Sequence, residues 1–221
     1  MINHEIRVTG DGSKTIFLPE LNETYHSSNG AVQESRHIFI QNGLDLVEKQ
    51  ASIHILEVGF GTGLNALLSA SWAEMNNQRI HYIGIEAFPL RPALCFQLDY
   101  PRHIDQNSEK IYDELIRCDW ERDNQLTIHF SIQKREVKIQ DFTAVEPIDL
   151  IYFDAFGPRV QAEMWDITIL AKMFQSLNVG GALVTYCAQG QFKRDLKSVG
   201  FILESLPGPP GKREMTRAIK I

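Results

Sequence analysis

The chain has 221 residues, of which 43% are hydrophobic and 23% charged, and its formal net charge is −6. This composition is typical of a folded protein and excludes a disordered chain, and the length fits one α/β domain with an added segment. No apolar run approaches the roughly 18 residues of a membrane span and the N-terminus has no signal-like apolar core, so we expect a cytoplasmic protein with no membrane partner.

The N-terminal part of the chain is expected to be an extension, residues 1–50, packed on a core of residues 51–221. Residues 5–10 and 14–19 are predicted to form a hairpin, because Asp11-Gly12 between them favours a tight turn. A helix is expected over residues 31–46, and its apolar face would consist of Val32, Ile38, Phe39 and Leu46.

From residue 53 onward the pattern alternates between strands and helices, which predicts an α/β fold with a mostly parallel sheet and helices on both faces. The last two strands are joined by a short loop and must therefore be antiparallel. Strands are expected over residues 53–58, 80–86, 126–132, 148–156, 180–187, 201–208 and 213–221. Helices are expected over residues 64–75, 162–177 and 190–200. In the strand of residues 126–132, the residues expected to face the core are Leu126, Ile128, Phe130 and Ile132.

Three alternating glycines, Gly59, Gly61 and Gly63, follow the first strand of the core in the stretch LEVGFGTGLN. Glycine permits positive φ and lets backbone N–H groups approach a ligand without a Cβ in the way. In doubly wound sheets such ligands bind at the carboxyl ends of the strands. We therefore expect this loop, including Phe60, to contact a nucleotide-type cofactor; the alternative is a tight turn with a structural purpose only.

Two cofactors compete for this loop, because residues 61–66 also fit the relaxed dinucleotide pattern G-x-G-x-x-A. Glu57 favours S-adenosyl-L-methionine over NAD: a carboxylate beside the loop repels a pyrophosphate and attracts an ammonium and a sulfonium. Glu86, at the end of the next strand, is expected to accept hydrogen bonds from the ribose hydroxyls of either cofactor. Asp141 offers a polar acceptor and Phe142 an aromatic face for the adenine.

A candidate for the chemistry follows the strand of residues 148–156, in the stretch DLIYFDAFGP. Asp154 lies at the carboxyl end of this strand and is expected to face the same crevice as the glycines. Methyl transfer to an amine needs an uncharged nitrogen, and a carboxylate can hold the amine and receive its proton. Phe156 could stack on a base and Pro158 would stiffen the loop. The alternative is that Asp154 caps a helix or turn.

No metal site is expected. The three cysteines, Cys95, Cys118 and Cys187, contain no C-x-x-C pair, and the seven histidines have no metal-binding spacing. The charge is unevenly distributed: residues 191–221 contain seven basic and three acidic residues, which leaves −10 for the rest of the chain. A small basic face formed by Lys193, Arg194, Lys212 and Arg213 is therefore possible, although an acidic body argues against broad contact with nucleic acid.

Five stretches together resemble a known family. They are YHSSNGAVQESRHIFI, LEVGFGTGLNALL, YIGIEAFPL, FDAFGPRVQAEMW and GPPGKREM. They are similar to the methyltransferase domain of the bacterial enzymes that make 5-methylaminomethyl-2-thiouridine at the wobble position of tRNA, and the resemblance runs from about Tyr25 to Met215. The glycine loop is shared by many methyltransferases, whereas D-A-F-G-P followed by M-W, and G-K-R-E-M, are specific to this family.

The resemblance implies a Rossmann-like class I fold that uses S-adenosyl-L-methionine to methylate the aminomethyl group of 5-aminomethyl-(2-thio)uridine in the anticodon of tRNA. It implies cofactor roles for Glu57, Gly59, Gly61, Glu86 and Asp141, and an acceptor-side role for Asp154. Tyr25, His26 and Ser27 would lie over the site, and Lys212 and Arg213 would meet anticodon phosphates.

Many relatives of this family carry a fused flavin-dependent oxidase, and we expect none in this chain, which would act as a stand-alone methyltransferase. Three other interpretations stay open. The first is a small-molecule amine methyltransferase or aminopropyltransferase, the second a module that binds the cofactor without turnover, and the third an NAD oxidoreductase.

Overall fold

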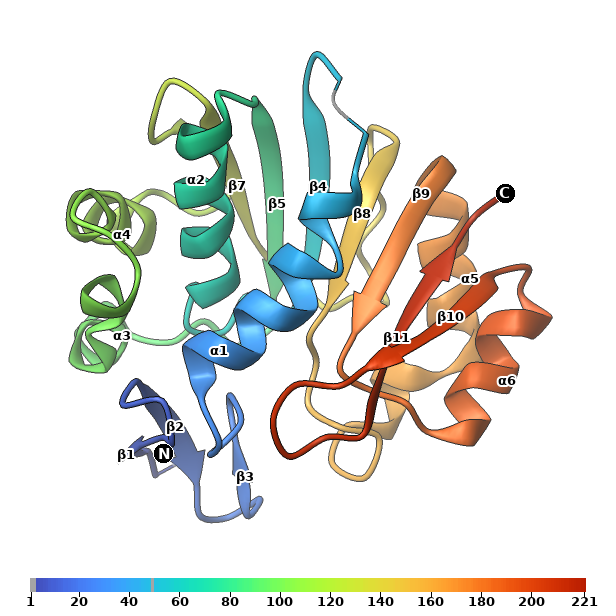
Figure 1. Cartoon of the computed structure of the whole chain (residues 1–221), viewed down its shortest axis with the longest axis horizontal. Coiled ribbons are helices and arrows are strands. Elements are labelled where there is room, and N and C mark those ends of the chain that lie inside the picture. Colours follow the sequence, from blue (N-terminus) through green and yellow to red (C-terminus); the bar gives the residue numbers. More distant parts are fainter. Residues whose placement is uncertain (1–2, 49) are drawn as a thin grey trace.

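A computed structural model describes residues 3–48 and 50–221 of the chain. An eight-stranded sheet forms its centre (Figure 1). In chain order its strands are β4 (Ile53–Val58), β5 (Ile80–Glu86), β6 (Asp123–Gln125), β7 (Phe130–Glu136), β8 (Ile148–Phe153), β9 (Leu177–Thr185), β10 (Ile202–Pro207) and β11 (Glu214–Ile219). Their order across the sheet is β10-β11-β9-β8-β4-β5-β7-β6.

Strands β9, β8, β4, β5 and β7 pair parallel with one another in this order, whereas β11 pairs antiparallel with both β9 and β10, and β6 pairs antiparallel with β7. The α/β class, the mostly parallel sheet and the antiparallel C-terminal strand are therefore confirmed. The central strands β4 and β8 are buried along almost their whole length because helices cover the sheet on both faces.

Within residues 3–48 and 50–221, six α-helices flank the sheet: α1 (Ala31–Ser35), α2 (Leu64–Asn76), α3 (Pro92–Cys95), α4 (Ser108–Arg117), α5 (Ile167–Ser176) and α6 (Gly190–Ser198). Figure 1 shows α1 and α2 across one face, and α5 and α6 on the side of β9 to β11. Two buried clusters correspond to these two faces. Ile53 and Ile55 of β4 belong to the cluster with α2, whereas Leu56 and Val58 belong to the cluster with α5 and α6.

Shorter helical turns account for several differences from the predicted elements. The helix expected over residues 31–46 continues past α1 as π-helical turns, η1 (Arg36–Gln41), and a 3-10 turn, η2 (Leu44–Leu46). Val32, Ile38 and Phe39 are buried as expected, but Leu46 is 51% exposed because it lies in the separate 3-10 turn that follows the end of η1 at Gln41. Three more 3-10 turns are η3 (Phe96–Leu98), η4 (Tyr100–His103) and η5 (Ala162–Trp165).

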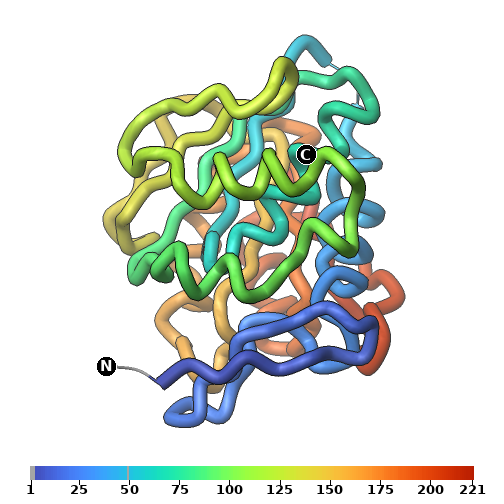
Figure 2. The backbone as a smooth tube through the Cα atoms, turned by 90° about the vertical axis from the view of Figure 1, so that its left-hand side faces the viewer, coloured from blue at the N-terminus to red at the C-terminus, as the bar shows by residue number. Residues whose placement is uncertain are grey.

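The strand expected over residues 126–132 is wrong at its beginning. Strand β7 begins only at Phe130, and Ile128 lies in the turn between β6 and β7 with 80% of its surface exposed. The helices of residues 92–117 were not predicted; they form the flank of the molecule that faces the viewer in Figure 2.

The N-terminal residues form a separate three-stranded sheet, β1 (Glu5–Val8), β2 (Lys14–Leu18) and β3 (Glu23–Thr24). The predicted hairpin is confirmed, since β1 and β2 are antiparallel and Gly12 in their turn has a φ of 84°. Figures 1 and 2 show this sheet below the main one, at the end where the arrow of β9 points. Ile16 and Leu18 of β2 join the buried cluster that contains α2.

No helix among the residues that the structure describes has both the length and the apolar character needed to cross a bilayer. In the same residues, no group of three or more His, Cys, Asp or Glu side chains is placed to hold a metal ion.

Gly84 lies in the middle of β5, and replacing it tests how tightly the glycine loop is packed on the sheet. A Cβ at this position would lie 2.6 Å from a ring carbon of Phe60, so Gly84→Ala overpacks the core. We expect it to lower the free energy of unfolding by about 1–3 kcal/mol in a urea titration.

The matched control is Gly190→Ala at the start of α6, where the nearest atom is the flexible end of Arg194, 3.4 Å away. We expect a change within about 0.5 kcal/mol for this variant. Equal stability of the two variants would contradict the packing of Phe60 on β5.

Candidate cofactor and acceptor pocket

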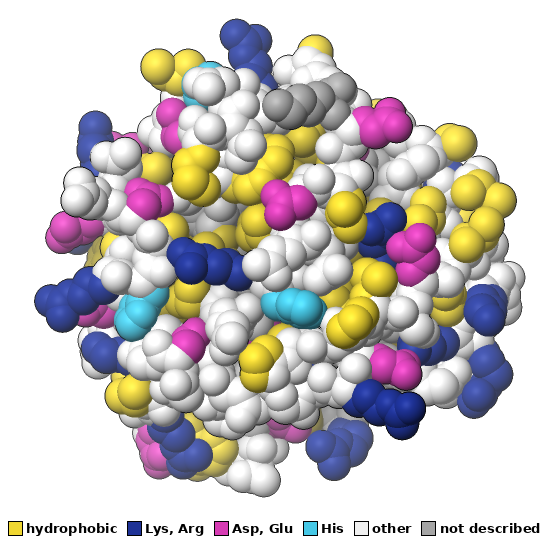
Figure 3. All heavy atoms as spheres, viewed as in Figure 1, with side chains coloured by type: hydrophobic (Ala, Val, Ile, Leu, Met, Phe, Trp, Pro, Cys, Tyr) yellow, Lys and Arg dark blue, Asp and Glu magenta, His cyan; other side chains and the backbone are white. Residues whose placement is uncertain are grey.

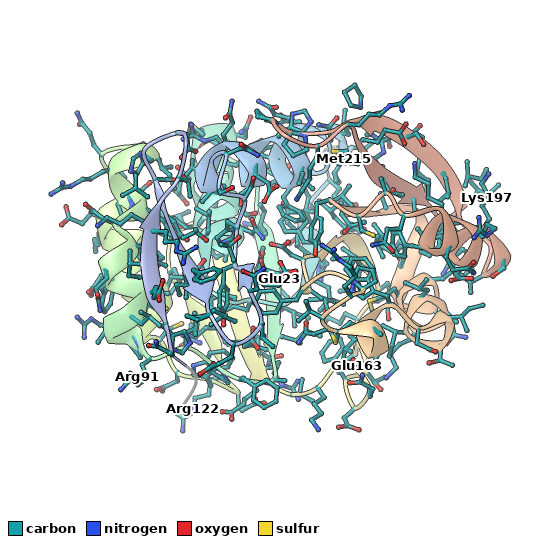
Figure 4. All side chains as sticks on the ribbon, turned by 90° about the horizontal axis from the view of Figure 1, so that it is seen from below. Glu23, Arg91, Arg122, Glu163, Lys197 and Met215 are labelled. Atoms are coloured by element: carbon teal, nitrogen blue, oxygen red, sulfur yellow. The ribbon has the colours of Figure 1, made fainter. Side chains whose placement is uncertain are left out.

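A cavity of about 1050 Å³ opens where β4, β5 and β8 end. Its walls come from the strand ends, the N-terminal residues around β3 with Glu34 of α1, the loops that follow β7, β8 and β9, and Lys212 of the loop between β10 and β11. Figure 4 shows this end of the molecule. Glu23, from β3, lies near the centre of the view, and Glu163, from η5, lies to its lower right. Both residues line the cavity.

The glycine loop forms part of this cavity, as predicted for two of its three glycines. Gly59 and Gly61 line it with φ values of 89° and 50°. A Cβ on Gly59 would lie 2.7 Å from the backbone oxygen of Asp154, and one on Gly61 would lie 3.3 Å from the ring of Tyr25. Glycine is therefore required here both by backbone conformation and by the closeness of neighbouring atoms.

Glu86 lies beside this loop with its carboxylate at the pocket wall. One oxygen accepts a hydrogen bond of 3.0 Å from the backbone N–H of Gly61, and the other accepts one of 3.0 Å from the N–H of Phe88. Each carboxylate oxygen has a further lone pair, so Glu86 can still accept hydrogen bonds from ligand hydroxyls. Its position at the end of β5 agrees with the sequence-based expectation.

The position expected for Glu57 is wrong. Its side chain has no exposed surface and is not among the described residues that line the pocket. Strand side chains alternate between faces, so Glu57 points with Ile53 and Ile55 toward α2, beneath the loop rather than into the opening. Burial, the largest cause, raises the pKa of Glu57 well above its usual range. Burial therefore favours the neutral form of Glu57, which weakens any attraction of a cationic ligand by this side chain.

Asn65 connects this buried carboxyl group to the pocket. Its Nδ2 donates one hydrogen bond of 2.8 Å to Oε1 of Glu57 and another of 2.9 Å to Oδ2 of Asp154. Asn65 lies in the first turn of α2, which begins after Gly63, a residue in the left-handed conformation. The sequence-based interpretation missed this role; the available signal was an amide in the first turn of an otherwise apolar helix.

Asp154 follows β8 and faces the cavity, as predicted. Its side chain is half-buried, and burial raises its pKa to about 7, with a further increase from the nearby carboxylate of Glu34. The hydrogen bond from Asn65 and the charge of Lys212 act in the opposite direction. Asp154 can therefore take up and release a proton near neutral pH, which is the property of a general base.

Three other residues predicted to contact the cofactor do not line the pocket. Phe60 is buried and packs on Trp120, with ring centroids 5.9 Å apart. Gly63 lies behind the loop, near the ring of Phe60, and Phe142 is buried in the cluster on the other face of the sheet. Both aromatic rings are needed to fill the core, which is why an aromatic next to a pocket motif was misleading. Asp141 lines the pocket as expected.

One side of the pocket is aromatic. Tyr25 and Phe156 meet edge to face with centroids 5.1 Å apart, and both line the cavity together with Pro158 and Ser27. His26 lines it too, but its Nε2 is 2.9 Å from the hydroxyl of Thr62, and burial lowers its pKa to about 4. His26 is therefore neutral at pH 7, and its ring holds the N-terminal segment against the glycine loop.

Lys212 does not lie where a phosphate-binding residue was expected. Its Nζ donates to Oε2 of Glu34 at 2.7 Å and lies 4.1 Å from the ring centroid of Tyr186. The N–H of Ser27 donates to the other oxygen of Glu34. This ion pair joins the loop between β10 and β11 to helix α1 across the pocket, so Lys212 is part of its wall.

The basic face expected from the C-terminal residues is smaller than predicted. Lys193 pairs with Glu214 at 2.8 Å, whereas Arg213 is exposed. Arg194 donates only to the neighbouring Gln191. Figure 3 shows Lys and Arg groups interspersed with acidic and apolar ones on the face that it displays.

The charges around the pocket fit a cofactor without phosphates. The acidic lining residues are Glu23, Glu34, Glu86, Asp141, Asp154 and Glu163; the basic ones are Lys138, Arg159 and Lys212. The carboxylates nearest the glycine loop, Glu86 and Asp154, would repel a pyrophosphate and attract an ammonium or a sulfonium. The attraction first assigned to Glu57 is thus supplied by other acids.

Residues 103–221, more than half of the chain, match a family described as S-adenosyl-L-methionine-dependent methyltransferase. The chain is also similar to two bifunctional proteins named MnmC, for tRNA 5-methylaminomethyl-2-thiouridine biosynthesis. It is 30% identical to that of Cupriavidus metallidurans over 96% of this chain and 33% of the relative. It is 31% identical to that of Leptospira interrogans over 94% of this chain and 34% of the relative. The chain thus spans about a third of the length of these relatives.

Two solved structures share the fold. MnmC2 from Aquifex aeolicus has a TM-score of 0.82 and 24% identity, and the match covers 99% of this chain and 70% of that chain. DesVI from Streptomyces venezuelae has a TM-score of 0.51 and 11% identity, with 86% of this chain and 92% of that chain covered. The Rossmann-like methyltransferase fold that the sequence predicts is therefore confirmed.

The preference of Glu57 for its neutral form can be tested through the affinity for S-adenosyl-L-methionine. Burial favours the protonated carboxyl group, and Glu57→Gln replaces it by a neutral amide of similar shape, so we expect the dissociation constant in calorimetry to change by less than about threefold. Glu86→Gln removes a charged acceptor from the pocket wall and should weaken binding about tenfold or more. A larger loss for Glu57→Gln than for Glu86→Gln would show that Glu57 is charged.

The raised pKa of Asp154 predicts how the stability of the protein depends on pH. The folded protein keeps this proton up to about pH 7, whereas the unfolded chain loses it near the usual value of 3.8. The free energy of unfolding should therefore fall as the pH rises through this interval. Asp154→Asn should remove that part of the fall, so that melting temperatures measured from about pH 4 to about pH 8 decline less than in the wild type.

Asp119→Asn, an exposed aspartate elsewhere, is the control and should follow the wild type. If the melting temperatures of Asp154→Asn and the wild type decline in parallel, Asp154 is not protonated in the fold.

Proposed function

Because this chain belongs to the S-adenosyl-L-methionine-dependent methyltransferase family, we propose that it transfers a methyl group to the amine of 5-aminomethyl-(2-thio)uridine at the wobble position of tRNA. The observation that carries this proposal is the carboxylate of Asp154 in the same pocket as the glycine loop. The choice of substrate is supported by the names of the two bifunctional relatives, which refer to the product of such a transfer.

S-adenosyl-L-methionine supplies an electrophilic methyl group on a positively charged sulfur. Within the pocket, Gly59 and Gly61 would let it approach the backbone closely, and Glu86 would accept hydrogen bonds from its ribose hydroxyls. Asp141, which lines the pocket after β7, offers a further acceptor. The preponderance of acidic residues around this part of the pocket favours a cationic ligand.

Asp154 would act on the acceptor amine. In water an aliphatic amine is mostly protonated at pH 7, and it must lose a proton before its lone pair can attack a methyl group. A carboxylate whose pKa is about 7 is a stronger base than an ordinary aspartate and remains partly ionised. Asp154 would orient the amine by a hydrogen bond and accept its proton.

The aromatic wall would hold the nucleobase that bears this amine. Tyr25 and Phe156 present rings at the mouth beside Asp154, and unstacked bases of RNA are commonly held between such rings. Pro158 would limit the motion of the loop that carries Phe156. Ser27 and His26 would lie over the base from the N-terminal side.

Contact with the rest of the tRNA would be restricted to a small area. Arg213 is exposed next to the pocket wall formed by Lys212, and Arg194 lies on the same C-terminal part of the chain. These residues would contact phosphates of the anticodon, while the acidic residues at the mouth would keep other phosphates away.

The direct test is transfer of labelled methyl to tRNA that carries 5-aminomethyl-2-thiouridine. We expect transfer by the wild type and a rate for Asp154→Asn that is lower by about 100-fold or more, since a positioned base contributes 10²–10⁴-fold. The affinity of this variant for S-adenosyl-L-methionine should be retained in calorimetry, which separates loss of chemistry from loss of folding.

Asp119→Asn serves as the control for this test too and should keep full activity. No label on the aminomethylated tRNA, together with label on free polyamines or other small amines, would replace the tRNA proposal by a small-molecule methyltransferase. Cofactor binding without any labelled product would instead support a module that binds the cofactor without turnover.

A further inference from the structure

Asn65 is a buried polar residue to which the proposed reaction has so far given no part. It lies in the first turn of α2, where only 2% of its surface is exposed. Its neighbours on this helix are almost all apolar or small, because the helix packs flat on the sheet. A buried amide is costly unless its polar atoms are used, so its two hydrogen bonds call for an explanation.

Both hydrogen bonds start from the same nitrogen. Nδ2 of Asn65 donates to Glu57 at 2.8 Å and to Asp154 at 2.9 Å, which uses both of its N–H groups. Oδ1 of Asn65 and Oε2 of Glu57 are buried and have no hydrogen-bond partner among the described residues. Both N–H groups of the amide are therefore bonded to carboxyl groups, and these two hydrogen bonds set the orientation of the amide.

We propose that Asn65 is a positioning residue that holds the carboxylate of Asp154 toward the acceptor amine and stabilises its charged form during turnover. This inference rests on the proposed function, because it gives Asp154 the part of the base. Glu57, buried on the other side of Asn65, accepts its second hydrogen bond and keeps the amide from turning away from Asp154.

The charged and titratable groups around Asp154 show why such a donor is needed. Glu34 of α1 disfavours a second negative charge in this place, and burial together with the charge of Asp154 raises the pKa of Tyr186, which follows β9 and keeps its proton. Lys212 favours it, but its ammonium is already paired with Glu34. Asn65 is the side chain that donates a hydrogen bond to Asp154 among the described residues. Without it the pKa of Asp154 would rise further, because burial would be less compensated.

The proton balance of the proposed step is simple. The amine nitrogen forms a bond to the methyl carbon while the bond from that carbon to sulfur breaks, and the electron pair stays on sulfur. The proton lost by the nitrogen goes to Asp154, which releases it to water through the pocket. The Nδ2 donor favours the ionised form of Asp154 that must be present before each turnover.

A structural role alone would have a different signature. If Asn65 only completed the packing of α2 against β4, its replacement would lower stability without moving the titration of Asp154. Ser69 supplies the control, because it lies one turn further along α2, is fully buried, and bonds the hydroxyl of Tyr152 at 3.2 Å without touching the pocket.

The experiment compares Asn65→Leu, which keeps the branched shape, with Ser69→Ala and the wild type. The carboxyl carbon of Asp154 is followed by NMR titration in the free protein labelled with ¹³C aspartate. We expect the midpoint for Asn65→Leu to lie higher than in the wild type by about one pH unit or more, as for the loss of one charge-assisted hydrogen bond. Ser69→Ala should leave it unchanged. If Asn65→Leu does not fold, Asn65→Ala gives the same comparison.

The rate of methyl transfer as a function of pH gives the second readout. The acidic limb of the profile should move upward by the same amount in Asn65→Leu, and in an Asp154→Asn background the Asn65 change should have no further effect on the rate. An unshifted midpoint in both Asn65 variants would overturn the proposal. Absence of transfer by the wild type would instead refute the proposed function, since the titration needs no substrate.

Discussion

The pocket depends on the two hydrogen bonds by which one amide nitrogen of Asn65 holds the carboxyl groups of Glu57 and Asp154. Two carboxylates so close in a buried place cannot both be charged without a counter-ion. Burial favours the neutral form of Glu57, whereas Asp154 faces the cavity. A negative charge on this pair is therefore favoured on Asp154, at the pocket.

A second constraint is closure of the pocket by segments far apart in the sequence. Glu34 of α1 and Lys212 of the loop before β11 pair at 2.7 Å, and the ring of Tyr186 lies under the ammonium. The N-terminal strands and the C-terminal hairpin therefore complete a cavity whose floor is made by the parallel strands. In the sequence Lys212 looks available to bind a phosphate, but in the structure its ammonium is paired with Glu34 in this wall.

The sequence predicted the central fold well, because strands such as residues 53–58 and 80–86 are apolar on both faces and are bounded by glycine or charge. It also located Gly59, Gly61, Glu86 and Asp154 at one edge of the sheet, which follows from parallel strand ends. The sequence could not show which way the side chain of Glu57 points. Adjacent positions on a strand face opposite sides, so a shift of one position would move this side chain from the core to the pocket.

Other errors had related causes. Phe60 and Phe142 are adjacent to pocket residues but fill the core, and nothing local distinguishes the two uses of an aromatic ring. Helix α4 was missed although four apolar or aromatic residues lie at helical spacing on its buried face, because the polar residues around them hide the pattern. The partners of Lys212 and Asn65 are distant in sequence, so their interactions emerge only from the folded chain.

The most direct test of the central claim is a crystal structure of the protein with S-adenosylhomocysteine, the product left after methyl transfer. We expect the ribose hydroxyls to bond Glu86, the sulfur to point toward the side of the pocket where Asp154 lies, and Glu57 to remain beneath the loop without touching the ligand. A ligand whose sulfur points away from Asp154, or that reaches Glu57 directly, would contradict this account.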